Sequence, residues 1–343
     1  MKQFLTNLLL ISALMSVSIY LGAFATRYAG TDPYAEYAQQ FAQFRQLQAA
    51  PDAISLGNSF AGALDFETLE LNGYHLWLSG GDLFEANYIL SEALATHSPP
   101  QTVFLNLSYF AFHHDNAATE TTHQRRKWLY NATNRWQIIE GDRSAFITGR
   151  LNRYLPGDTV LSTAKVPLLR TLLGLQAPVA KHPLYHPDGQ PVHDRYQQCA
   201  SNSYEGHAEH SERVATRQAL FLQEMAQDRP NIQLGTRSAL EQSIQIAQAQ
   251  RVTLVLYIPP FFEAYNEVYD FDGKQSALRL IEQLSAASGV HFYDFSAETT
   301  LSNNPTLFFD PIHLNQCGAR RFSQLLAAQL RADGIISAEQ TTP

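Results

Sequence analysis

The sequence predicts an α/β protein built on a parallel β-sheet with helices on both faces. Five short apolar segments, rich in residues that favour strands, are spaced along the chain. Helical segments separate them, and strand–helix alternation of this kind builds a parallel sheet between two helical layers. The expected strands are residues 53–59, 74–79, 102–110, 252–258 and 290–295.

Composition limits what such a protein does. With 343 residues, 45% of them hydrophobic, the chain is long enough for one large domain with an insertion. A net charge of -8 and the lack of a long basic run argue against a nucleic-acid partner. The two cysteines, Cys199 and Cys317, are too few for a cysteine-rich scaffold or a cysteine-based zinc site. An oxidising compartment would allow them to form one disulfide, and the sequence leaves this pairing open.

The N-terminal segment predicts export. No charged residue lies between Lys2 and Arg27, and residues 8–21 are strongly apolar. Gly22-Ala-Phe-Ala25 resembles a signal-peptidase site, whereas the uncharged run also has the roughly 20 residues that a membrane span needs. Two interpretations therefore stay open for residues 1–27: a cleaved signal peptide or an N-terminal membrane anchor. Both place the remaining chain in the periplasm or on another extracytoplasmic face of the membrane.

The chain after this leader divides into a connecting helix, a main domain and a short tail. Thr31-Asp-Pro33 supplies a helix cap and an N-terminal proline, and aromatic residues follow at helical spacing, so residues 28–51 are expected to form an amphipathic helix. Residues 52–335 form the main domain, and 336–343 are a tail. Within the domain, the apolar residues of segments 86–94, 278–284 and 322–330 recur at helical spacing.

The alternation of strands and helices is lost between about residues 111 and 230. This stretch is much longer than an ordinary connection and mixes aromatic helical pieces with Pro- and Gly-rich turns. We expect a helical and irregular insertion that packs over the edge of the active site and shapes a substrate groove. A purely structural elaboration of the domain is the alternative.

Two stretches far apart in the sequence carry the chemistry. Ser59 ends the first expected strand after a Gly-Asn pair, and Asp310 precedes His313 by three residues. A serine hydroxyl becomes a nucleophile when an imidazole removes its proton, and a carboxylate orients that imidazole. In parallel sheets, functional groups gather at the carboxyl ends of the strands, where Ser59 is expected. Taken singly, Ser59 is an ordinary turn residue and Asp310 an ordinary helix cap.

Together these residues resemble the conserved blocks of the SGNH (GDSL-like) hydrolases. Leu56-Gly-Asn-Ser59 is similar to the nucleophile block, with Asn in place of the usual Asp, and residues 309–319 are similar to the final block that holds Asp and His. The resemblance implies a three-layer αβα sandwich with a five-stranded parallel sheet in flavodoxin-like order. It also implies a Ser59–His313–Asp310 triad. Leu78-Ser-Gly-Gly81 matches the position of the family's oxyanion glycine, for which Gly80 is the candidate.

Residues 98–112 resemble the third strand of the membrane-anchored branch of this family. That branch includes proteins of alginate O-acetylation and teichoic-acid D-alanylation. The resemblance implies an ester hydrolase or O-acyltransferase that acts on acylated cell-envelope carbohydrate or lipid, with a membrane acyltransferase as partner and without a metal or organic cofactor. The alternative is a non-catalytic protein of the same fold that binds an envelope polysaccharide or assists acylation.

One departure from the family bears on catalysis. The family's third block ends in Gly-x-Asn-Asp, whose Asn donates a hydrogen bond to the oxyanion, but this chain has Ser108-Tyr-Phe-Ala111 there. Loss of one such donor lowers the rate by about 10²–10³-fold. The sequence therefore predicts a complete triad beside an oxyanion hole that lacks one donor.

Overall fold

The computed structural model describes most of the chain outside the leader and the middle of the insertion. The described residues are 33–118, 120–133, 136–139, 142–154, 199, 211–218, 220–221, 232–268 and 274–337, with single residues between 3 and 18. They divide into two compact units. The helical unit comprises Met1–Ala42 and Thr121–Leu184, and the sheet unit comprises Gln43–Glu120 and Tyr185–Pro343.

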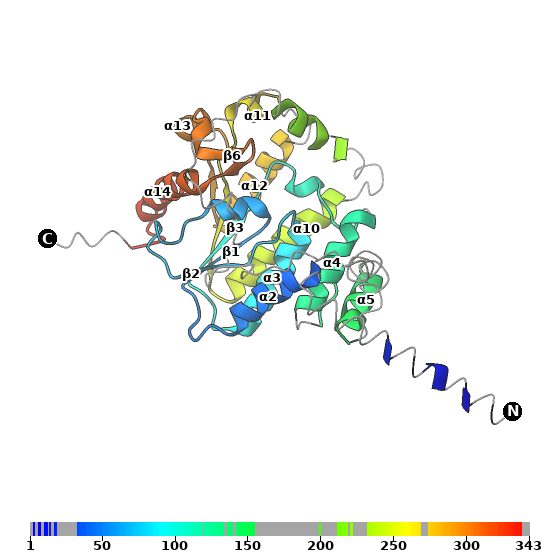
Figure 1. The fold of residues 1–343 in the computed structure, drawn as a ribbon. Helices are drawn as coiled ribbons and strands as arrows, with labels where there is room; N and C mark the ends of the chain where they lie inside the picture. Colours follow the sequence, from blue (N-terminus) through cyan, green and yellow to red (C-terminus); the bar gives the residue numbers. More distant parts are fainter. Residues whose placement is uncertain are drawn as a thin grey trace. The chain divides into compact units, whose positions relative to one another are not determined.

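The sheet unit contains a five-stranded, all-parallel sheet in the order β2-β1-β3-β4-β5 (Figure 1). The strands are β1 (Ala53–Leu56), β2 (Gly73–His75), β3 (Thr102–Asn106), β4 (Thr253–Ile258) and β5 (His291–Asp294). All five predicted strands are therefore confirmed, although each is shorter than its apolar run. Strand β1 ends at Leu56 because Gly57 has φ +119°, a conformation outside the strand region.

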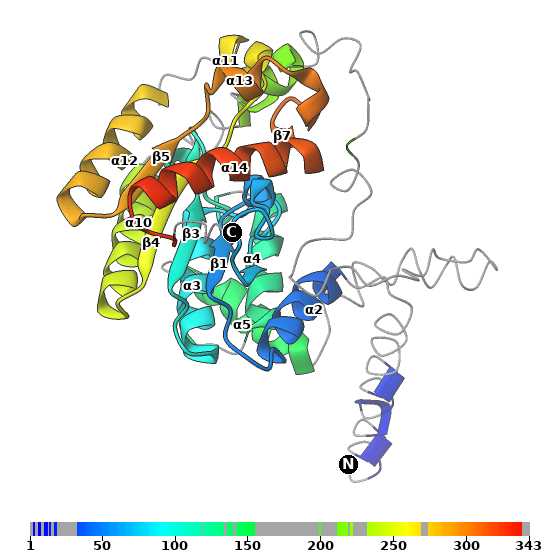
Figure 2. The same cartoon turned by 90° about the vertical axis from the view of Figure 1, so that its left-hand side faces the viewer.

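Helices cover both faces of this sheet. Helices α3 (Leu83–Thr96) and α10 (Ile232–Ala249) lie on one face and α14 (Gln316–Ala332) on the other, as Figures 1 and 2 show. Side chains alternate between the faces of a strand, so Val255 and Tyr257 of β4 join Phe322 and Leu326 of α14 in one buried cluster. Helix α12 (Lys274–Ser288) lies beside α10, where the Gln248 amide donates to the Ser288 carbonyl at 3.0 Å.

The helices of the sheet unit begin at well-formed caps. Asp82 and Glu85 form a reciprocal capping box at the start of α3, and the Asn315 side chain accepts the Gly318 N–H at the start of α14. The connections contain the short elements η1 (Ser59–Ala63), η2 (Ala111–His113), α11 (Glu263–Val268), α13 (Thr299–Ser302) and η3 (Pro305–Leu307). A two-stranded antiparallel sheet, β6 (Phe308–Asp310) and β7 (His313–Leu314), directly precedes α14.

The helical unit holds α2 (Pro33–Arg45, whose last turn belongs to the sheet unit), α4 (Glu120–Ala132) and α5 (Arg143–Tyr154). Helix α2 lies within residues 28–51, where the sequence predicts a helix, and its role as a connection to the leader stays a prediction. In α4, the Arg126 guanidinium is fully buried and donates to the Asp142 carboxylate at 3.0 Å. A buried guanidinium is tolerated when it is paired in this way, so this ion pair fixes the start of α5 against α4.

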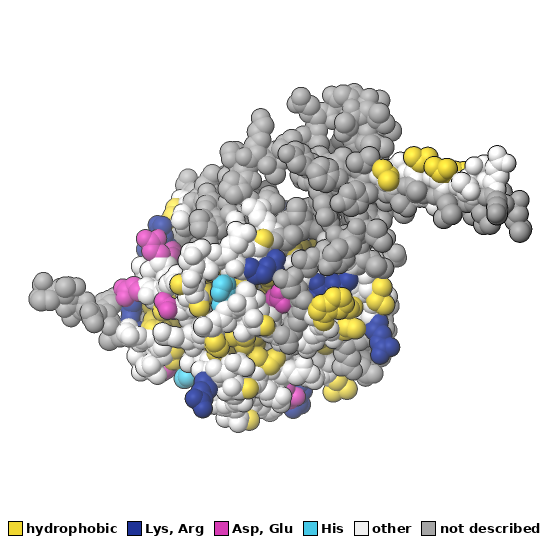
Figure 3. Space-filling model, turned by 90° about the horizontal axis from the view of Figure 1, so that it is seen from below, with side chains coloured by type: hydrophobic (Ala, Val, Ile, Leu, Met, Phe, Trp, Pro, Cys, Tyr) yellow, Lys and Arg dark blue, Asp and Glu magenta, His cyan; other side chains and the backbone are white. Residues whose placement is uncertain are grey.

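Parts of two sequence predictions fall outside the described residues. Residues 155–198 and 200–210 of the predicted insertion are not described, so its role at the edge of the active site stays a prediction. The leader is described only at isolated positions, where Leu10, Ile11, Leu14 and Val17 are exposed (Figure 3). Within the described part of the chain, no helix combines the length and apolarity needed to cross a membrane.

Cys199 and Cys317 form a disulfide. The bond joins a residue of the predicted insertion to the first turn of α14, 118 positions later in the sequence. Closing so long a loop lowers the entropy of the unfolded chain, which stabilises the native sheet unit by about 4–5 kcal/mol in the chain-entropy account. The pairing that the sequence left open is therefore made in the structure.

Acid is expected to destabilise the fold through His75. This side chain is 1% exposed, and burial lowers its pKa from 6.5 to about 3. Between these two values the unfolded chain binds a proton at His75 that the native protein does not bind, so unfolding becomes easier as the pH falls. From pH 7 to pH 5, the free energy of unfolding measured in urea should fall by about 2 kcal/mol more for the wild type than for His75→Phe. Equal losses in the two proteins would contradict a neutral, buried His75.

Candidate active site

Ser59 is held by a sharp turn at the carboxyl end of β1. A Cβ atom on Gly57 would lie 2.8 Å from the Asn106 carbonyl oxygen of β3, and the φ of +119° is itself strained for any other residue. Asn58 then caps η1, because its Oδ1 accepts the Phe60 N–H at 3.0 Å. Ser59 follows as the first residue of η1 and is only partly buried.

The β6–β7 hairpin places the imidazole and its carboxylate. Asp310 Oδ1 accepts the backbone N–H of Ile312 at 2.9 Å and of His313 at 2.8 Å, which closes the turn between the strands. The imidazole Nδ1 of His313 lies 2.9 Å from Asp310 Oδ2 and 3.0 Å from Oδ1. Burial opposes ionisation of Asp310, but His313 and the two backbone donors outweigh it and hold the pKa of Asp310 below its usual value. Asp310 is therefore an ionised acceptor at neutral pH.

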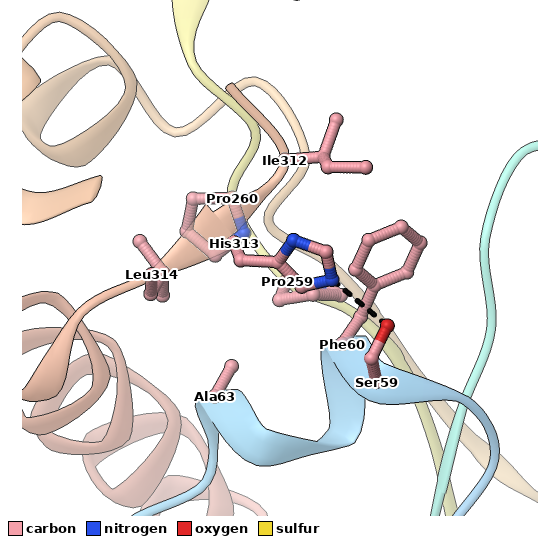
Figure 4. Close-up of a pocket in the computed structure, with 8 residues that line it drawn as sticks. All are labelled: Ser59, Phe60, Ala63, Pro259, Pro260, Ile312, His313 and Leu314. Atoms are coloured by element: carbon pink, nitrogen blue, oxygen red, sulfur yellow. Dashed lines mark hydrogen bonds between the residues drawn. The ribbon is translucent and has the colours of Figure 1, made fainter. Parts of the chain in front are cut away.

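The three predicted triad residues form one hydrogen-bonded chain. His313 Nε2 lies 2.8 Å from Ser59 Oγ, across 254 positions of sequence (Figure 4). Because the Asp310 carboxylate only accepts hydrogen bonds, the proton of the neutral imidazole resides on Nδ1. The lone pair on Nε2 therefore faces the serine hydroxyl, which is the arrangement that general-base activation of a nucleophile requires.

Aromatic rings fix the plane of the imidazole. Phe309 stacks on His313 with ring centroids 5.1 Å apart and planes inclined by 8°. Phe60 packs against the same ring at 5.0 Å. These contacts restrict rotation of the His313 side chain. Together with the hydrogen bonds to Ser59 and Asp310, they hold the ring in one orientation.

A shallow pocket opens beside Ser59 and His313. The residues that line it come from η1, the end of β4 and the β6–β7 hairpin (Figure 4); they are Ser59, Phe60, Ala63, Pro259, Pro260, Ile312, His313 and Leu314. Apart from Ser59 and His313, every lining side chain is apolar. A substrate that enters here therefore meets polar side chains at the reacting atoms and apolar surface around them.

The Gly80 turn is fixed by a buried polar network. Gly80 has φ +63°, and its carbonyl accepts the Asn116 side-chain amide at 3.0 Å. Asn116 also donates through its side chain to Glu85 at 2.7 Å and through its backbone to Asp82 at 2.6 Å. The N–H of Gly81 donates to the Leu78 carbonyl at 2.8 Å. Gly80 is thus the better of the two glycines for an oxyanion donor, and that role stays a prediction.

The Ser59 backbone N–H is the other expected oxyanion donor. The next two N–H groups of η1, those of Phe60 and Ala61, donate to the Asn58 side chain and carbonyl respectively. Among the described residues, no acceptor is found for the N–H of Ser59. This group therefore stays available to a ligand at the nucleophile.

Sequence reasoning missed Asn106, the last residue of β3. The sequence matches residues 108–111 to the block that lacks the oxyanion donor, and the strand is predicted only from its apolar residues. The structure buries the Asn106 side chain in a second pocket, next to Gly57 and Asn58. A polar residue that ends an otherwise apolar strand, Val-Phe-Leu-Asn106, was the available signal. As for metal sites, the described residues contain no group of three or more His, Cys, Asp or Glu side chains that would hold an ion.

Replacing Gly57 tests the turn that holds Ser59. Gly57→Ala combines a strained φ with a clash against the β3 backbone, whereas Gly289→Ala has a similar positive φ (+68°) and no atom within 4 Å of the added Cβ. Urea unfolding should show a loss of about 1 kcal/mol for Gly289→Ala and about 3 kcal/mol or more for Gly57→Ala. Similar losses for the two variants would show that β1 and β3 are not closely packed at this turn.

Comparison with known proteins adds no relative. No protein-family model matches the chain, and a search of curated proteins finds no significant match. The resemblance to the SGNH hydrolases therefore remains a prediction from the sequence motifs.

Proposed function

We propose that this protein is a serine ester hydrolase or O-acyltransferase of SGNH type that acts on acylated cell-envelope carbohydrate or lipid. The observation that carries the proposal is the continuous hydrogen-bonded chain from Ser59 through His313 to Asp310. Two further features support it. The nucleophile lies at the carboxyl end of a parallel strand, and the strand order of the sheet is the one that the family resemblance implies.

In this proposal, catalysis proceeds through an acyl-enzyme. Ser59 Oγ attacks the ester carbonyl while His313 Nε2 accepts the hydroxyl proton, and Asp310 stabilises the resulting imidazolium. The backbone N–H groups of Ser59 and Gly80 hold the oxyanion of the tetrahedral intermediate. Collapse of this intermediate breaks the ester C–O bond, and the leaving alcohol takes the proton from His313 Nε2. Water or a sugar hydroxyl, deprotonated by His313, then attacks the acyl-enzyme, the bond between the acyl carbon and Ser59 Oγ breaks, and Ser59 Oγ takes the proton from His313.

The form of the site favours esters on a large substrate. The pocket at Ser59 is shallow, Phe60 lines it, and Phe309, which stacks on His313, is partly exposed. A shallow site admits an ester that projects from a polymer or a lipid surface. Exposed aromatic faces also pack well against the apolar faces of sugars or against acyl chains.

Two features support a location outside the cytoplasm. The Cys199–Cys317 disulfide is typical of oxidising compartments, and the leader has the composition of an export signal or membrane anchor. In this proposal the leader brings the protein to the membrane, where a membrane acyltransferase supplies or receives the acyl group.

The second candidate is a non-catalytic protein that binds an envelope polysaccharide or assists acylation. It is favoured by one observation, the presence of Ser108-Tyr-Phe-Ala111 where the family has its Asn donor. In this alternative, the fold presents its aromatic pocket to the polymer and the triad performs no turnover.

Ester turnover separates the two candidates. We expect the purified protein to release acetate from acetylated oligosaccharides or from 4-nitrophenyl acetate. Ser59→Ala should abolish this activity, and Asp310→Asn should lower kcat by about 10³–10⁴-fold because it reverses the imidazole tautomer.

Ser276→Ala, an exposed position on α12, is the matched control and should keep the wild-type rate. Equal rates for wild type and Ser59→Ala would exclude Ser59 as the nucleophile. No turnover of any ester by folded wild type would favour the binding protein.

A further inference from the structure

A second pocket lies against the turn that carries the nucleophile. We call it the Asn106 pocket. It lies between the carboxyl ends of β1 and β3 and the start of α3, all within the sheet unit. Its lining residues are Gly57, Asn58, Gly81, Asp82, Leu83, Ala86, Asn106, Ser108, Phe110, Ala111 and His114.

Two side chains in this pocket are buried without a hydrogen-bond partner. Asn106 is 3% exposed and Ser108 is 1% exposed. Among the described residues, the Nδ2 and Oδ1 atoms of Asn106 and the Oγ atom of Ser108 have no hydrogen-bond partner. Burying such a group unpaired costs about 1–3 kcal/mol, and folded proteins keep few of them. These three polar atoms therefore need a hydrogen-bond partner, which an ordered water or a polar group of a ligand would supply.

The other polar side chains of the pocket are already engaged within the fold. Asn58 accepts the Phe60 N–H, and Asp82 accepts the N–H groups of Glu85 and Asn116. His114 contacts the Asn116 side chain at 3.2 Å. Asn106 and Ser108 are thus the residues lining this pocket that bury polar side-chain atoms without a partner among the described residues.

The chemistry of these two residues specifies the ligand group. The Asn106 amide offers a donor at Nδ2 and an acceptor at Oδ1, and the Ser108 hydroxyl both donates and accepts. A methyl group would satisfy neither residue. A carboxylate would leave Oδ1 without a donor, and an ammonium group would leave Nδ2 without an acceptor. A hydroxyl group both donates and accepts, and the free space is about that of one water-sized group.

The position of the pocket assigns it to the acyl side of the substrate. His313 must protonate the leaving alcohol, so the alcohol portion belongs in the pocket that contains His313. The Asn106 pocket is instead lined by Gly57 and Asn58, the two residues before Ser59 in the sequence, and by Gly81, next to the expected oxyanion donor Gly80. The substituent on the carbonyl carbon extends in that direction.

We propose that the Asn106 pocket is an acyl-binding subsite that selects a short acyl group bearing a hydroxyl on its second carbon. The hydroxyl enters the pocket, where Asn106 and Ser108 bind it beside the apolar side chains of Leu83, Ala86 and Ala111. This inference rests on the proposed ester chemistry. It adds the acyl class to a function that otherwise specifies only an ester.

Matched esters test the subsite. Phenyl glycolate and phenyl propionate differ only by OH in place of CH₃ on the acyl group. The wild-type kcat/KM for each ester is divided by the rate constant of that ester's hydrolysis by hydroxide. The normalised value should be about 10–100-fold higher for phenyl glycolate than for phenyl propionate, because propionate leaves the buried polar atoms unpaired. Asn106→Leu should remove this preference, so that the normalised rates of the two esters become similar. Ser108→Ala removes one hydroxyl and leaves Asn106 in place, so it should reduce the preference only partially.

Binding is measured separately from turnover. In Ser59→Ala labelled with ¹⁵N-asparagine, the side-chain amide signals of Asn106 are assigned by their loss in the variant that also carries Asn106→Leu. Glycolamide should shift these signals, and propionamide should not. The proposed function fails alone if glycolamide shifts the signals but wild type cleaves neither ester.

The subsite is overturned by either of two results. One is an equal effect, or no effect, of the two amides on the Asn106 signals. The other is ester turnover by wild type with a normalised glycolate preference that Asn106→Leu leaves unchanged.

Discussion

The hydrogen bond between Ser59 and His313 depends on two rigid turns that are distant in sequence. One turn follows β1, where Gly57 packs against the β3 backbone so closely that a Cβ atom would lie 2.8 Å from a carbonyl oxygen. The other is the β6–β7 hairpin, which Asp310 closes from within by accepting two backbone N–H groups. Asn315, which follows the hairpin, links η3 to α14, since its side chain donates to the Thr306 carbonyl at 2.7 Å and caps the helix. The 2.8 Å contact is therefore set by backbone geometry on both sides.

Burial of polar groups follows the same plan around the site. Asp82, Glu85 and Asn116 hydrogen-bond to one another and fix the Gly80 turn, so their burial stabilises a defined loop. Asn106 and Ser108 are equally buried, but their side-chain polar atoms have no partner among the residues that the structure describes. The first group thus serves the fold. The second is placed where a substrate would complete it, at the edge of the sheet where parallel α/β proteins bind their ligands.

Much of this fold could be predicted from the sequence, because the strands are local apolar runs and their alternation with helices limits the topology. The triad was also predictable, since Gly-Asn-Ser59 and Asp310-Pro-Ile-His313 are short motifs whose order along the chain carries information. Other features depend on contacts between distant residues. The ends of β1 and β3 are set by the Gly57–Asn106 approach, and the Cys199–Cys317 pairing by the fold as a whole. Whether a buried Asn106 has a partner is likewise a property of the packed structure.

Covalent labelling tests the central claim, that Ser59 is an activated nucleophile, without knowledge of the natural substrate. Folded protein is treated with a fluorophosphonate probe and analysed by peptide mass spectrometry. The account predicts one adduct, on the peptide that contains Ser59, which is absent in Ser59→Ala and much slower to form in His313→Ala. An unlabelled but folded wild-type protein, or an adduct on another residue that persists in Ser59→Ala, would contradict it.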